Sequence, residues 1–185
     1  MIVIRNTLDF HIDRPTAVCI GKFDGVHVGH RKLLEHITAQ RQRGMLACVF
    51  TFDPSPEELF SGKKTEVLCN RTEKESYLEE LGVDVIIEFP LTFKTAATEP
   101  EDFVKDYLVE RLNMKYIAAG DDLTFGAGGR GNKELIEQLS IQYGFECDII
   151  EKVRVDGEIV SSSRIREAIE LGHNEEAFRM LGRTN

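Results

Sequence analysis

The chain of 185 residues is 42% hydrophobic and 30% charged, a balance that excludes a disordered chain and suffices for one hydrophobic core. Its formal net charge of −9 argues against a nucleic acid as partner, because nucleic-acid binding requires a basic face. No apolar stretch reaches the roughly 18 residues of a membrane span and no signal peptide is apparent, so we expect a cytoplasmic protein without a membrane partner.

Short apolar runs alternate with helical patterns along the chain, in the order typical of an α/β sheet. Each run is apolar nearly throughout, as expected for parallel strands that are covered on both faces. The sequence therefore predicts one domain over residues 1–185, with a doubly wound, mostly parallel sheet. The predicted strands are Thr16–Ile20, Leu46–Phe52, Val83–Glu88, Tyr116–Ala119 and Cys147–Ile150.

The predicted helices lie between these strands and after the last of them. Capping-box patterns open two of them, and glycines end several of them. An Asp156-Gly157 pair between two short β-type runs predicts a hairpin over Val153–Val160. The helices are expected to begin near His27, at Thr72–Glu75, at Thr98–Glu101 and at Lys133, and to span Arg164–Leu171 and Glu175–Leu181 at the end of the chain.

The segment GKFDGVHVGH, residues 21–30, places two histidines between a predicted strand and a predicted helix. Ligands bind beyond the carboxyl ends of such strands, and the start of a helix offers unpaired N–H groups to anions. His27 and His30 can share one helix face, and Gly25 and Gly29 allow the backbone to approach a ligand. The pattern predicts a polyphosphate site. The alternatives are a surface and a core histidine, or a zinc site that lacks an apparent third ligand.

The segment VSSSRIREA, residues 160–168, carries three serines before two arginines at a predicted helix start. Ser163 is the expected N-cap, and capping alone would need only one serine. Hydroxyls, free N–H groups and guanidinium groups that converge there favour phosphate oxygens. The segment therefore predicts a second anion site, in which Arg164 has simple surface charge as its alternative role.

These motifs resemble those of the bacterial FAD synthetases, the adenylyltransferase half of the bifunctional riboflavin kinase/FAD synthetase family. H-x-G-H resembles a motif of the wider nucleotidyltransferase superfamily. The preceding F-D-G-V resembles the motif found in its flavin branch, the FAD synthetases. Residues 51–56, TFDPSP, resemble the family pattern T-F-x-P-H-P with Ser55 in place of its histidine. Residues 118–132, AAGDDLTFGAGGRGN, resemble its glycine-containing loop. The resemblance spans roughly residues 15 to 183 and implies a Rossmann-like nucleotidyltransferase fold.

The resemblance implies transfer of AMP from ATP to FMN, which gives FAD and pyrophosphate. Aromatic and proline-lined loops suit a flat, largely apolar flavin ring. The implied catalytic residues are His27, His30, Ser162 and Arg166. The implied ATP-binding residues are Gly21, Phe23, His27, Gly29, His30, Ser162, Ser163 and Arg166. The implied flavin-binding residues are Asp53, Pro54, Asp122, Leu123 and Phe125.

Other groups at the site follow from the substrates. Mg²⁺ is expected because it neutralises triphosphate charge, with Asp24, Asp53 and Asp122 as candidate ligands only. The four cysteines are widely spaced and predict free thiols rather than a zinc site. A riboflavin kinase domain is expected to be absent, because only two residues follow Leu181-Gly182-Arg183, the stretch after which that domain begins in two-domain family members.

Three alternatives accompany this interpretation. Another small-molecule nucleotidyltransferase, acting on nicotinate mononucleotide, phosphopantetheine or glycerol phosphate, would share the fold and both phosphate motifs. A non-catalytic nucleotide or flavin sensor would share the binding residues without turnover. The glycines of Gly126–Gly131 match a dinucleotide fingerprint, but Asp121–Phe125 separates them from the preceding strand, which disfavours such a site.

Overall fold

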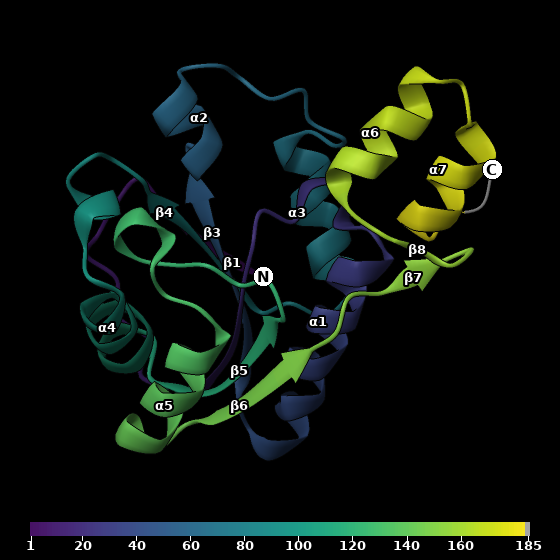
Figure 1. Ribbon diagram of the computed structural model, residues 1–185. Helices are drawn as coiled ribbons and strands as arrows, with labels where there is room; N and C mark the ends of the chain where they lie inside the picture. The colour runs from purple at the N-terminus through teal and green to yellow at the C-terminus, as the bar shows by residue number, and fades with distance from the viewer. Residues whose placement is uncertain (184–185) are drawn as a thin grey trace.

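The computed structural model describes residues 1–183 and shows one six-stranded sheet with helices on both faces (Figure 1). The strand order is β1-β4-β3-β2-β5-β6, and every neighbouring pair runs parallel. The predicted doubly wound, mostly parallel fold is confirmed. The strands are β1 (Ile2–Arg5), β2 (Thr16–Ile20), β3 (Leu46–Asp53), β4 (Val85–Pro90), β5 (Met114–Gly120) and β6 (Glu146–Ile150), with β7 (Arg154–Val155) and β8 (Glu158–Ile159) as the predicted antiparallel hairpin.

Helices cover both faces of the sheet and bury its continuous apolar runs. Leu34 and Ile37 of α1 and Leu78 of α3 pack on one face. The other face packs against α5 and the π-helical stretch η4 that continues α4. The helices are α1 (Val28–Ala39), α2 (Pro56–Ser61), α3 (Arg71–Glu80), α4 (Pro100–Asp102), η4 (Phe103–Arg111), α5 (Lys133–Tyr143), α6 (Ser162–Glu170) and α7 (Asn174–Leu181). No helix within residues 1–183 is long and apolar enough to cross a bilayer.

Both predicted capping boxes were wrong. The capping box of α3 is formed by Asn70 and Glu73 instead of Thr72 and Glu75, because the helix begins two residues earlier. Helix α4 begins with a proline at its first turn, and its N-cap makes no side-chain hydrogen bond, so Thr98 does not cap it.

Serines cap two helices near the carboxyl edge of the sheet. The Ser55 hydroxyl accepts the N–H of Glu58 and so starts α2, a helix that the sequence analysis did not predict. The Ser161 hydroxyl accepts the N–H of Arg164, so Ser161 and not Ser163 is the N-cap of α6. Ser162 therefore lies in the first turn of α6.

The sheet positions a site at its centre. Strand β2 lies between β3 and β5, so the chain winds outward in both directions from it. The crevice beyond the carboxyl ends of β2 and β5 is the point where ligands bind in such sheets. The helix pair α6–α7 forms its own small core beside this edge, close to α1 and the β7–β8 hairpin (Figure 1).

Candidate active site

A strained turn carries the chain from β2 to the first histidine. Phe23, Gly25 and Val26 all have positive φ, at 53°, 76° and 44°. Only glycine fits at position 25, because a Cβ there would also lie 3.0 Å from the Leu68 Cβ. Phe23 is fully buried, with its ring centroid 5.0 Å from that of His30. The Phe23 side chain therefore packs against His30 from beneath, and a contact of this residue with ATP stays a prediction.

His27 and His30 stack face to face, with ring centroids 3.6 Å apart and planes inclined by 14°. His27 is the N-cap of α1, and its Nδ1 accepts the His30 backbone N–H at 3.3 Å. An accepting Nδ1 assigns the proton of the neutral His27 ring to Nε2, which is then a donor. The His30 Nδ1 is buried and makes no hydrogen bond within residues 1–183.

Both imidazoles are held in the neutral form. Burial lowers the pKa of His27 to about 4, although the nearby Asp24 carboxylate opposes the shift. Burial and the proximity of His27 also lower the pKa of His30 well below its ordinary value. At neutral pH the pair therefore offers ring N–H groups, and not positive charge, to an incoming ligand.

His27 and His30 line a cavity of about 290 Å³ at the centre of the sheet edge, here called the first cavity. Ile150, Val153 and Val160 supply an apolar wall, and Ser162 stands at the start of α6. Of the predicted site residues, the first cavity brings together Gly21, His27, Gly29, His30, Asp122, Leu123 and Ser162.

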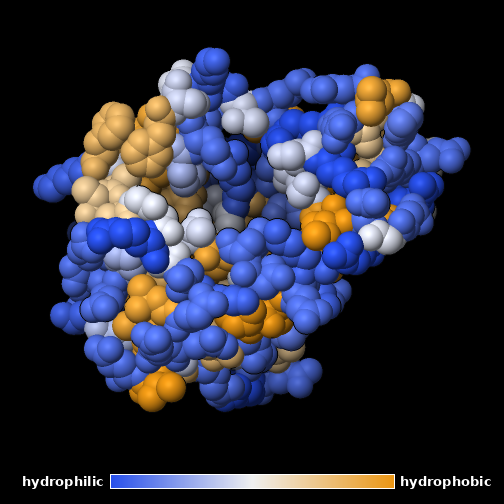
Figure 2. Space-filling view, viewed as in Figure 1, coloured by the Kyte–Doolittle hydropathy of each residue, from blue (hydrophilic) through white to orange (hydrophobic). Residues whose placement is uncertain are grey.

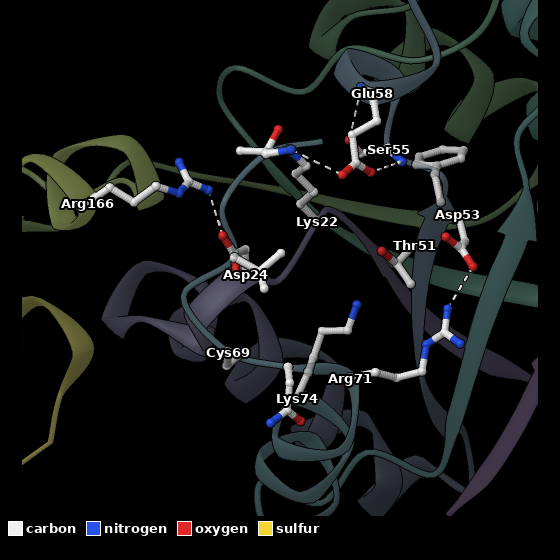
Figure 3. A pocket seen from close by; sticks show the side chains of 14 residues that line it. Lys22, Asp24, Thr51, Asp53, Ser55, Glu58, Cys69, Arg71, Lys74 and Arg166 are labelled. Atoms are coloured by element: carbon white, nitrogen blue, oxygen red, sulfur yellow. Dashed lines mark hydrogen bonds and ion pairs between the residues drawn. The ribbon is translucent and has the colours of Figure 1, made fainter. Parts of the chain in front are cut away.

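A second cavity, of about 180 Å³, lies beside Asp24 and contains many charged side chains (Figure 3). The surface is hollowed between α2 and the α6–α7 pair (Figure 2). The sequence analysis did not single out Lys22, Arg71 or Lys74, because their positions depend on the tertiary fold. The charged residues that line the second cavity are Lys22, Asp24, Asp53, Glu58, Arg71, Lys74 and Arg166.

Arg166 lies in the second cavity, apart from the histidines. Its Nη2 contacts the Asp24 Oδ2 at 2.6 Å, and its Nε donates to the Glu66 carbonyl at 2.7 Å. The other Asp24 oxygen accepts the Leu68 N–H at 2.8 Å. The Ser162 hydroxyl donates to the Asp24 carbonyl at 3.1 Å. Asp24 and the first turn of α6 therefore form the wall between the two cavities.

The predicted flavin-binding residues do not form one cluster. Asp53 lines the second cavity and pairs with Arg71 at 2.7 Å, whereas Asp122 and Leu123 line the first. Phe125 is only 4% exposed and packs on Phe103 in the core, which argues against the predicted flavin contact of this ring. Pro54 and Ser163 are exposed, and neither is among the residues that line the two cavities.

An exposed aromatic pair lies near the second cavity. Phe60 of α2 and Phe93 are 63% and 69% exposed, with ring centroids 6.0 Å apart. Apolar atoms gather on this side of the hollow, over α2 (Figure 2). Glu58, on the same helix as Phe60, lines the second cavity. The sequence analysis did not identify this pair, since α2 was not predicted.

The described residues contain no preformed metal cage. Residues 1–183 hold no group of three or more His, Cys, Asp or Glu side chains that could bind an ion. The candidate ligands Asp24, Asp53 and Asp122 are each engaged in an ion pair, with Arg166, Arg71 and Lys152 respectively. The four cysteines are free thiols, as predicted.

Known proteins with similar sequences carry flavin-related names. A bifunctional riboflavin kinase/FMN adenylyltransferase of Escherichia coli K12 is 38% identical over 152 residues, which cover 81% of this chain and 49% of that protein. An FAD synthetase of Listeria monocytogenes is 34% identical over 173 residues, or 91% of this chain and 69% of that protein. The chain thus spans about half the length of the bifunctional relative.

Solved structures show the same fold. A Streptococcus pneumoniae structure described as a macrolide-efflux protein superposes with a TM-score of 0.85 at 29% identity, covering 98% of this chain and 60% of that chain. A pantoate-beta-alanine ligase of Francisella tularensis shares the fold with a TM-score of 0.56 at 15% identity, covering 94% and 77%. The FAD synthetase family model matches residues 9–164. With most of its length matched, and with both predicted phosphate motifs at one sheet edge, the chain belongs to the FAD synthetase family.

Proposed function

We propose that the chain is an FMN adenylyltransferase, which transfers AMP from ATP to FMN and releases pyrophosphate. One observation carries the proposal: two cavities adjoin at Asp24 and Ser162, with the stacked histidines in the first. A reaction between two bound substrates needs such adjoining cavities, so that the reacting groups meet at the shared wall. Membership of the FAD synthetase family supports the choice of substrates.

ATP is assigned to the first cavity. Its adenosine would lie against the apolar wall of Ile150, Val153 and Val160. Its phosphates would then face the ring N–H groups of His27 and His30. The first turn of α6 adds the Ser162 hydroxyl and unpaired backbone N–H groups. Asp122 and Leu123 share this cavity and would face the nucleotide.

FMN is assigned to the second cavity. Lys22 and Lys74 provide positive charge for its phosphate, which would approach the wall formed by Asp24. The flavin ring would reach toward the exposed pair of Phe60 and Phe93, since flat aromatic groups stack on such side chains.

The chemistry requires positioning and charge stabilisation without a protein nucleophile. An FMN phosphate oxygen attacks the α-phosphorus of ATP, and the bond to the pyrophosphate oxygen breaks. Neutral His27 and His30 would donate hydrogen bonds to the phosphate oxygens as charge develops on them. To bind the leaving pyrophosphate, Arg166 would have to break its ion pair with Asp24 and pair with a phosphate oxygen instead.

The site suits a Mg²⁺ ion that is bound mainly through the phosphates of ATP. When bound, it neutralises charge on the triphosphate, and it commonly keeps several waters and phosphate oxygens as ligands. The absence of a three-ligand cluster within residues 1–183 agrees with an ion that the phosphates hold. We further propose a cytoplasmic location and, because the net charge of −9 disfavours nucleic-acid binding, small-molecule substrates without a nucleic-acid partner.

Chromatography of products tests the proposal. The purified chain is incubated with ATP, Mg²⁺ and FMN, and both FAD and pyrophosphate are measured. Parallel reactions contain nicotinate mononucleotide, phosphopantetheine or glycerol phosphate as the acceptor. We expect product only in the reaction with FMN as the acceptor, where FAD and pyrophosphate should both form. Pyrophosphate release with a different acceptor, or ATP binding without pyrophosphate release with any acceptor, would contradict the proposal.

A further inference from the structure

The end of α7 contacts the turn that delivers the histidines. We infer that Arg183, which follows α7, is a positioning residue that holds the turn Asp24–Val26 and thereby sets the orientation of His27 and His30. The catalytic part of this inference rests on the proposed adenylyltransferase function, whereas the structural part does not. None of the sequence motifs described above includes this role.

Side chains from separate elements hold the backbone of the turn. Each of its three carbonyl oxygens accepts a hydrogen bond from a side chain outside the turn. These bonds run from Ser162 Oγ to the Asp24 oxygen at 3.1 Å, from Arg183 Nη2 to the Gly25 oxygen at 2.9 Å, and from Arg31 Nε to the Val26 oxygen at 3.4 Å. The Gly25 N–H is also engaged, by the Cys69 sulfur at 3.2 Å.

The turn needs such restraint because its backbone is strained. Phe23 and Val26 both have left-handed backbone angles, which side chains with a Cβ rarely adopt. A strained conformation persists only where the surrounding structure determines it. Loss of a restraint on Gly25 would let the turn relax, and His27 follows Val26 directly.

Arg183 is itself held on two sides. Its guanidinium lies 4.1 Å from the centre of the Tyr77 ring on α3, while Nη2 donates to the Gly25 carbonyl. Stacking on an aromatic face fixes the plane of a guanidinium and thus the direction of its N–H groups. A lysine could not reproduce this planar arrangement. Arg183 therefore joins α3, α7 and the turn at one point.

The two residues before Arg183 also pack against the histidine segment. A Cβ on Gly25 would lie 3.2 Å from the Leu181 Cδ2, and a Cβ on Gly182 would lie 2.9 Å from the Val28 Cγ1. Gly182 has a φ of 65°, so glycine is required there on two grounds. Residues 181–183 thus pack against Gly25 and against the Val28 side chain, which lie on either side of His27.

The experiment compares Arg183→Ala with Arg179→Ala. Arg179 is the matched control, because it lies on α7 and pairs only with the exposed Asp156 among residues 1–183. Without substrates, NMR measures the imidazole signals of the histidines and hydrogen exchange at the amides of Gly25 and Val26. Arg183→Ala is expected to shift the signals of His27 and His30 and to speed exchange at the turn about tenfold, while Arg179→Ala matches the parent.

Turnover provides the second measurement. Arg183→Ala is expected to lower kcat for FAD formation about tenfold and to change KM for FMN less. The catalytic pair moves, whereas Asp24, the residue of the turn that lines the second cavity, keeps its hydrogen bonds to Arg166 and to the Leu68 N–H. Arg183→Lys keeps the charge and loses the planar geometry, so its kcat should fall as well. It also replaces the alanine variant if that variant does not fold.

Several results would overturn the inference. Parental imidazole signals and parental exchange at the turn in a folded Arg183 variant would do so, whether or not FAD forms. Equally faster exchange at all amides would show that Arg183 acts on general stability. If the parent itself forms no FAD, the proposed function fails, and the NMR comparison still decides whether Arg183 holds the turn.

Discussion

Replacement of His27 by asparagine tests the conclusion that the histidine pair is neutral. Asparagine is a good N-cap, so α1 keeps an acceptor for the His30 N–H. The pKa of His27 is about 4 in the fold, against about 6.5 in an unfolded chain. Because the folded pKa is the lower one, protons favour the unfolded chain. The contribution of the neutral His27 ring to the free energy of unfolding is fully present above the unfolded pKa, and it is lost as the pH falls toward the folded pKa.

The size of the effect follows from these two pKa values. Between about pH 7 and about pH 4.5, the His27 side chain should cost the parent about 2 kcal/mol of unfolding free energy. His27→Asn removes this loss, and it also removes the effect of His27 on the pKa of His30, which acts in the same direction. The variant should therefore lose at least about 2 kcal/mol less than the parent over this range.

Urea unfolding at the two pH values measures the difference. His11→Asn serves as the control, because the His11 side chain is 65% exposed and lies outside both cavities. It should retain the parental pH dependence. The same pH dependence in His27→Asn as in the parent would refute the reasoning, and with it the view that the histidines meet phosphate as neutral donors.

Three further predictions concern the core, the second cavity and the substrate range. Phe125→Ala should lower stability by about 3 to 5 kcal/mol with an unchanged Kd for FMN, because the ring packs in the core; a weakened flavin titration at parental stability would contradict this. Arg166→Ala should raise the KM for ATP more than that for FMN, because Arg166 is proposed to bind the leaving phosphates; steady-state kinetics with each substrate varied will show equal changes if this placement is wrong. The chain of 185 residues should form no FMN from riboflavin, ATP and Mg²⁺, because both cavities are assigned to adenylyl transfer; FMN detected by chromatography would overturn that assignment.

The sequence predicted the central strands well, because a strand buried on both faces leaves an unbroken apolar run. Thr16–Ile20 is reproduced residue for residue as β2. Strand β1, Ile2–Arg5, was not predicted because it is a short edge strand that pairs only with β4. The start of α3 could not be chosen from sequence, since Asn70 and Thr72 each stand three residues before a glutamate.

The candidate site was predicted in part. The two predicted phosphate motifs meet at one sheet edge, because the first follows β2 directly and the second follows the β7–β8 hairpin that comes after β6. This arrangement places Ser162 with the histidines. Arg166 comes four residues later and thus lies one turn along α6, facing the second cavity. Its pairing with Asp24 joins positions 142 residues apart, which no local pattern reveals. The burial of Phe125 depends in the same way on packing against Phe103.

The burial of Val26 offsets the strain in its backbone. A β-branched residue with a φ of 44° costs about 1 to 2 kcal/mol relative to a relaxed backbone. Glycine adopts such angles freely, but it would remove a side chain that is only 1% exposed and packs in the core, a loss of about 1.5 to 3 kcal/mol. The change would therefore give the segment before His27 more freedom of movement without raising the melting temperature. Screens that reward thermal tolerance should not enrich glycine at this position.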